Sequence, residues 1–231
     1  MATPDSVLAL ERDLRVIFTD RLQSLVSYRP ANDAAAPLLP TLATLRHLTV
    51  DDLRACASQV DRWHDAGLAT PLLLTSGEFA RALDAFPLEF GAIIADYTVI
   101  AGNDPFSGLS IEAADARRAC EVQARSHLLH LREGYIETRG RGDALAELIT
   151  DSVAPLSGLV KSVARLLGQP TNEAPAAAGV VERAAGVPQG SLSSVASRRS
   201  PVGGDEARRL FPQHLDAVER LTQFVDRWGR S

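Results

Sequence analysis

Two histidines, His127 and His130, lie three residues apart in a long helical pattern, and Glu133 and Glu137 follow on a nearby stripe. Residues at positions i and i+3 lie on one face of a helix, so both imidazoles could be presented to one metal ion. A metal site needs further ligands, and the sequence identifies no third one. We therefore interpret the two histidines as polar residues on a helix flank, with a metal site as the alternative.

Glu89 and Arg29 are two further candidates for contact with a ligand. Glu89 stands between Leu88 and Phe90 in an otherwise apolar stretch. Half-burial there would raise the pKa of its carboxyl, as it does for functional acids, although we favour a pairing with an arginine across a helix interface. Arg29 follows a strand-like run, where its guanidinium could contact a phosphate or simply lie on the surface.

The elements that must position these residues begin with an amphipathic helix, which Asp5 or Ser6 can cap. Three apolar, strand-like runs follow, and a helix capped by Thr49 lies between the second and the third. The three runs are Leu22–Tyr28, Thr41–Leu45 and residues 70–75, and the second strand is expected to end near Leu48. The order helix, strand, strand, helix, strand predicts a small α/β unit over residues 1–75.

The remainder, residues 76–231, is predicted to form a helical bundle. Helical patterns follow Ser76 and restart at Pro87, and a short strand is expected near residues 97–100. The longer patterns predict helices over residues 111–139, 143–167, 173–185 and from 205 onward. Pro155 indicates a kink, and residues 188–204 have the composition of a flexible loop. The predicted fold class is α+β and mostly helical, with the α/β unit followed by an antiparallel bundle.

This division resembles the nucleotidyltransferase-like proteins of bacteria, in which an N-terminal catalytic domain is followed by helices that close over the substrate. Residues 8–75 match in element order, and residues 76–229 match in helical character. Residues 86–90, 102–105 and 118–121 resemble stretches of uncharacterised members of this group. The resemblance implies a reduced nucleotidyltransferase-like unit at the N-terminus.

The residues that carry catalysis in that family have no counterpart here. In active members the first strand runs into Gly-Ser, and carboxylates on the next strands hold metal ions that neutralise phosphate charge. Here the first strand runs into Arg29-Pro30, and Asp33 is the only carboxylate between the first and second strands. We therefore predict a catalytically degenerate member that acts as a ligand- or protein-binding module without a cofactor. The alternative is an active nucleotidyltransferase with unrecognised metal ligands, which alone would require Mg²⁺.

Arg125 and His130 also match the Arg-x4-His pattern of the HEPN ribonucleases, helical proteins often partnered with minimal nucleotidyltransferases. This second resemblance implies an acid/base pair that cleaves RNA. The chain has 24 basic residues besides five histidines, so such a match is expected by chance. A HEPN-like ribonuclease that uses Arg125 and His130 is kept as a further alternative.

Composition limits the partners that we expect. The net charge of −5 argues against nucleic acid, which requires a positive field. The two cysteines, Cys56 and Cys120, form no disulfide or zinc pattern, which favours a reducing compartment. No signal peptide or membrane-spanning run is evident. We expect a soluble, cytoplasmic protein that binds a small molecule, a nucleotide or a protein partner.

Overall fold

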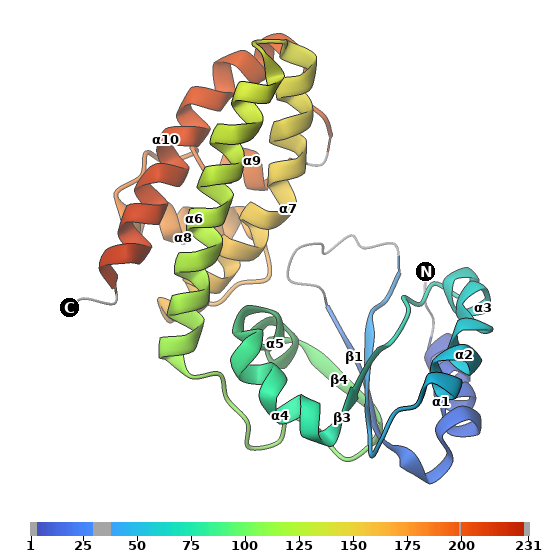
Figure 1. The fold of residues 1–231 in the computed structure, drawn as a ribbon. Helices are drawn as coiled ribbons and strands as arrows, with labels where there is room; N and C mark the ends of the chain where they lie inside the picture. The colour runs from blue at the N-terminus through green and yellow to red at the C-terminus, as the bar shows by residue number, and fades with distance from the viewer. Residues whose placement is uncertain (1–3, 30–37, 199, 229–231) are drawn as a thin grey trace. The chain divides into compact units, whose positions relative to one another are not determined.

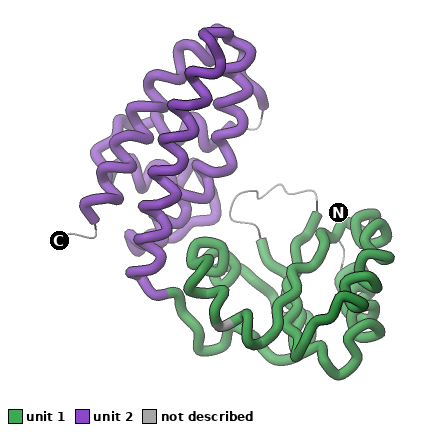
Figure 2. The backbone as a smooth tube through the Cα atoms, in the orientation of Figure 1, with its two compact units in different colours: residues 1–111 green, residues 112–231 purple. Residues whose placement is uncertain are grey.

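The computed structural model describes residues 4–29, 38–198 and 200–228, and Pro30 and Asp33 therefore lie outside the described residues. The chain forms two compact units, Met1–Ile111 and Glu112–Ser231 (Figure 2). Within the described residues, no helix is both long and apolar enough to cross a lipid bilayer.

The first unit is built on a four-stranded sheet with the order β3-β2-β1-β4. The strands are β1 (Leu22–Tyr28), β2 (Thr41–Leu45), β3 (Leu72–Thr75) and β4 (Tyr97–Gly102). The central strand β1 pairs antiparallel with β2 and β4, whereas β2 and β3 are parallel. The predicted bounds of the first strand are confirmed, whereas the second strand ends at Leu45, before the expected end near Leu48.

Helices cover both faces of this sheet, with α1 to α3 on one face and α4 and α5 on the other (Figure 1). Each face of the sheet has its own hydrophobic core. In β1, Leu25 belongs to the core beneath α1 to α3, and the next residue, Val26, belongs to the core beneath α4 and α5. A single 3₁₀ turn, η1 (Thr19–Arg21), joins α1 to β1. The helices are α1 (Pro4–Phe18), α2 (Val50–Ala57), α3 (Val60–Asp65), α4 (Ser76–Ala85) and α5 (Pro87–Ala95).

Two capping boxes fix the helix starts next to the sheet. The Thr49 hydroxyl accepts the Asp52 amide and the Asp52 carboxylate accepts the Thr49 amide, as predicted for a Thr49 cap. Thr75 and Glu78 form the same arrangement at α4, directly after β3. Each box provides a hydrogen-bond acceptor for two backbone amides at the start of its helix, and so fixes where the helix begins.

The second unit consists of helices, and α6, α7 and α10 pack against one another along their length (Figure 1). A three-residue link joins α6 to α7, with Arg139 and Gly140 in the left-handed region at φ 52° and 76°. This link makes the two helices antiparallel neighbours. The helices are α6 (Ala113–Thr138), α7 (Gly142–Leu166), α8 (Ala174–Ala185), α9 (Ser193–Ala196) and α10 (Gly204–Trp228).

The division between the units differs from the predicted boundary at residues 75/76. It lies at 111/112, because β4 pairs with β1 and because α4 and α5 pack on the sheet. The predicted loop 188–204 also differs, since it contains the short helix α9. There the carboxylate of Glu182 accepts the amides of Gly190, Leu192 and Ser193 at 2.8–3.1 Å.

Candidate ligand-binding pocket

A pocket of about 430 Å³ opens on the first unit, on the face of the sheet that α4 and α5 cover. Tyr28 and Arg29 enter it from the end of β1, Leu72 and Leu74 from β3, and Glu89 from α5. The remaining lining residues are apolar and come from α4 and α5: Ala82, Phe86, Phe90, Ala92 and Ile93. The structure thus brings Arg29 and Glu89, two of the sequence-predicted site residues, to one pocket.

The local sequence explains why the pocket stays open. Pro87 occupies the first turn of α5, where it needs no amide partner, and therefore restarts the helix after α4. Phe86 lies at this break with 55% of its surface exposed, and Leu72 on the sheet edge is 40% exposed. Large apolar side chains that remain exposed inside a concavity are typical of ligand pockets.

Arg29 supplies the positive charge of this pocket. Its guanidinium lies 3.7 Å from the Asp96 carboxylate, and its side chain is 74% exposed. An exposed pair at this distance contributes little energy, so the guanidinium can turn to an anionic ligand at little cost. Its backbone amide donates to the Asp96 carbonyl, which fixes the main chain at the end of β1.

Tyr28 and Glu89 complete the polar groups of the pocket. Burial raises the pKa of the Tyr28 phenol, which therefore stays a neutral hydroxyl at pH 7. Glu89 is exposed, so the half-burial considered for it is not observed. Within the described part of the chain, the Glu89 carboxylate forms no ion pair. The predicted pairing of Glu89 with an arginine is therefore wrong as far as the described arginines are concerned.

The pocket does not suit a catalytic metal. None of β1 to β4 contains an aspartate or a glutamate. Thr41 at the start of β2 is fully buried, and its hydroxyl has no hydrogen-bond partner among the described residues. Over residues 4–29, 38–198 and 200–228, no group of three or more His, Cys, Asp or Glu side chains could hold a metal ion. The four described strands therefore supply no carboxylate to a Mg²⁺ ion.

Arg125 and His130, the other two predicted site residues, lie on α6 in the second unit. Both line a shallow hollow of about 310 Å³ with Glu121. The Arg125 guanidinium donates to the Asp226 carboxylate at 2.7 Å and to Glu121 at 3.1 Å. Because two carboxylates already hold this guanidinium, the geometry does not favour the acid/base role implied by the HEPN resemblance.

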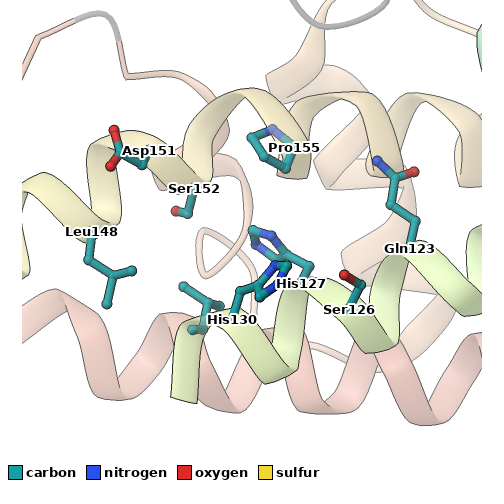
Figure 3. Close-up of a pocket in the computed structure, with 9 residues that line it drawn as sticks. Gln123, Ser126, His127, His130, Leu148, Asp151, Ser152 and Pro155 are labelled. Atoms are coloured by element: carbon teal, nitrogen blue, oxygen red, sulfur yellow. The ribbon is translucent and has the colours of Figure 1, made fainter. Parts of the chain in front are cut away.

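His127 lines a separate pocket between α6 and α7, together with His130 (Figure 3). Its side chain is buried, and burial and the neighbouring His130 lower its pKa to about 4. Behind it, burial and His127 lower the pKa of His214 on α10 to about 3. Sequence reasoning missed Asp151 and Ser152 on α7 and His214 on α10. Pro155, which lies within one turn of Asp151 and Ser152, was the available signal for those two, and the sequence held no signal for His214.

Comparisons with known proteins bear on the fold. No protein-family model matches the sequence, and no curated protein matches it significantly. Among solved structures, the chain is similar to that of spectinomycin adenyltransferase AAD(9) from Enterococcus faecialis with ATP and spectinomycin. The TM-score is 0.55 at 12% sequence identity, over 97% of this chain and 99% of that chain. The chain therefore has a nucleotidyltransferase-like α+β fold, as the sequence predicted.

Proposed function

We propose that this chain is a catalytically degenerate member of the nucleotidyltransferase-like fold that binds a nucleotide-class ligand without transferring a nucleotidyl group. The observation that carries the proposal is a sheet without a single carboxylate, beside a pocket that holds Arg29. The solved neighbour is an adenyltransferase bound to ATP, which supports a nucleotide as the ligand class.

The argument against catalysis is one of charge. Nucleotidyl transfer develops negative charge on the transferred and leaving phosphate oxygens, and divalent metals neutralise it. Bound Mg²⁺ is held through protein carboxylates as well as substrate phosphates. Arg29 offers one exposed positive charge, and Glu89 is the one carboxylate among the residues that line the pocket. These groups can bind a phosphate but cannot hold a metal pair.

The argument for binding rests on the shape and polarity of the pocket. Its apolar wall includes the exposed ring of Phe86, on which a flat base can stack. The Arg29 guanidinium presents a planar set of donors that suits phosphate oxygens, and the Tyr28 hydroxyl adds a neutral donor. A ligand with a flat apolar part and an anionic part matches this arrangement.

Calorimetric titration with ATP tests the proposal. We expect binding to the wild-type chain, and a loss of affinity of about tenfold in Arg29→Gln, the effect of removing one charge-assisted contact worth about 1.4 kcal/mol. Arg46→Gln is the matched control, since Arg46 is an exposed arginine of the same unit that does not line the pocket. No ATP binding, or equal losses in both variants, would contradict the proposal.

A further inference from the structure

Glu89 is the one carboxylate among the described residues that line the pocket of the first unit. Of the ten lining residues, three carry polar side-chain groups: the Arg29 guanidinium, the Tyr28 hydroxyl and the Glu89 carboxylate. Within the described part of the chain, the exposed Glu89 carboxylate makes no ion pair or side-chain hydrogen bond. Its two oxygens are therefore available to accept hydrogen bonds from a ligand.

The positive and the negative group of this pocket lie at opposite ends of α5. The Arg29 guanidinium lies 3.7 Å from the carboxylate of Asp96, the residue that directly follows this helix. Glu89 lies seven residues earlier, in the first turn of α5, which is about 10 Å along the axis at a rise of about 1.5 Å per residue. Residues seven apart lie on the same side of a helix, so one ligand in the pocket can contact both groups.

This separation of charge orients a nucleotide. The Glu89 carboxylate repels phosphate groups, whereas the Arg29 guanidinium attracts them. A nucleotide whose phosphates contact Arg29 has its base on the other side of the ribose, toward Glu89. Phe86 lies at this same end of α5, three residues before Glu89, and 55% of its surface is exposed for stacking on the base.

The Watson–Crick edges of the purine bases differ in how they suit a carboxylate. Guanine presents two neighbouring donors there, N1–H and the 2-amino group, which match the two carboxylate oxygens. Adenine presents the acceptor N1 beside its 6-amino group, so one carboxylate oxygen faces a lone pair. Hypoxanthine keeps N1–H but lacks the 2-amino group. Because paired, charge-assisted hydrogen bonds are stronger than a single one, guanine is the purine that Glu89 favours.

We propose that the pocket of the first unit selects guanine nucleotides, with the Glu89 carboxylate accepting hydrogen bonds from N1–H and the 2-amino group of the base. Phe86 stacks on the base, and Arg29 contacts the phosphates. This selectivity rests on the nucleotide binding proposed above and adds the identity of the base. Glu89 determines which purine is bound, while Arg29 and Phe86 contribute affinity for any purine nucleotide.

Calorimetric titration of the full chain with GTP, ITP and ATP tests the selectivity, because these ligands share the ribose and the triphosphate and differ only in the purine. We expect GTP to bind about tenfold more tightly than ATP, a difference of about 1.4 kcal/mol, with ITP between them. Glu89→Gln should bring the affinities for GTP and ATP to within about twofold, because an amide offers one acceptor and one donor. Asp84→Asn is the control. It removes the same charge at an exposed position of α4 outside the pocket and should leave the preference for GTP unchanged.

Phe86→Leu tests where the base lies. It should weaken the binding of all three nucleotides by a similar factor, because stacking on an aromatic ring does not depend on the identity of the base. A loss confined to one nucleotide would contradict this placement. Equal affinities of the wild-type chain for GTP and ATP, or a preference for GTP that persists in Glu89→Gln, would overturn the selectivity while leaving nucleotide binding in place. No binding of any of the three would contradict the proposed function itself, and the selectivity with it.

Discussion

The imidazoles of His127 and His214 lie edge to face across the packing of α6 on α10, with ring centroids 6.2 Å apart. His214 is fully buried, and its Nε2 atom lies 3.4 Å from the Ser152 hydroxyl on α7. Three helices thus meet around two rings that burial keeps neutral. This arrangement makes the second unit sensitive to acid.

The stability of the chain should therefore fall between pH 6.5 and pH 5. Unfolded histidines take up protons near pH 6.5, whereas the folded pKa values are about 4 for His127 and about 3 for His214. Since the unfolded state binds more protons in this window, each histidine should lower the free energy of unfolding by up to about 1.4 kcal/mol per pH unit, a limit approached near pH 5. Urea unfolding at pH 7, 6 and 5 measures the slope.

Substitutions test whether the two buried histidines cause this pH dependence of the free energy of unfolding. His127→Gln should remove about half of it, because an amide does not titrate. His47→Gln serves as the control, since His47 is exposed in the first unit. A slope that His127→Gln leaves unchanged would show that the buried rings do not cause the acid sensitivity.

Asp52 should be important for the stability of the first unit. Arg21 donates two hydrogen bonds to its carboxylate, at 2.7 and 2.8 Å, and this pairing with the Thr49 cap holds the pKa of Asp52 well below its usual range. Asp52→Asn should lower the free energy of unfolding by about 2–4 kcal/mol at pH 7, since it removes the counter-charge of a partly buried guanidinium and weakens the cap.

Asp51→Asn is the matched control for this pair. Asp51 is the adjacent acid in the first turn of α2, but its side chain is 86% exposed. Its ion pair is with Arg54, three residues later on the same helix. Its loss should cost less than about 1 kcal/mol. Urea unfolding measures both variants. Equal decreases in the free energy of unfolding would mean that the ion pair between Arg21 and Asp52 contributes no more than an exposed ion pair.

Glu182 should hold the segment around α9 in place. This carboxylate is 2% exposed and accepts three backbone amides and the Ser193 hydroxyl. Glu182→Gln turns one acceptor into a donor that faces those amides, so we expect hydrogen exchange to rise at least tenfold over residues 190–196. Glu173→Gln, at the exposed start of α8, should leave that exchange unchanged.

Much of the first unit could be predicted from the sequence because its signals are local. Thr49 predicts the start of its helix as a capping residue, and the run Leu22–Tyr28 has the observed bounds of β1. The long-range partner of β1 could not be found in this way. β4 follows α5 by one residue, yet it pairs across the sheet with β1, about 70 residues earlier in the chain, so the boundary was placed too early.

The sites follow the same distinction between local and distant signals. Arg29 and Glu89 were predicted as candidate ligand-binding residues from their types and their neighbours in the sequence. That they line the same pocket follows from the packing of α5 on the sheet, which the sequence does not show. The second pocket combines His127 on α6 with Asp151 on α7, and His214 comes from α10. The packing of the core determines which faces of the three helices meet. The hydrophobic periodicity of one helix does not specify how that helix is aligned with a neighbouring helix.

The central claim is that the first unit binds a nucleotide without a metal-dependent step. Calorimetric titration with ATP in 5 mM Mg²⁺ and again in EDTA tests it most directly, because a carboxylate-held metal would couple the two affinities. We predict dissociation constants that agree within about threefold, since Arg29 and the apolar wall supply the contacts. A loss of ATP affinity of a hundredfold in EDTA, or about 2.7 kcal/mol, would contradict the account and indicate an active nucleotidyltransferase.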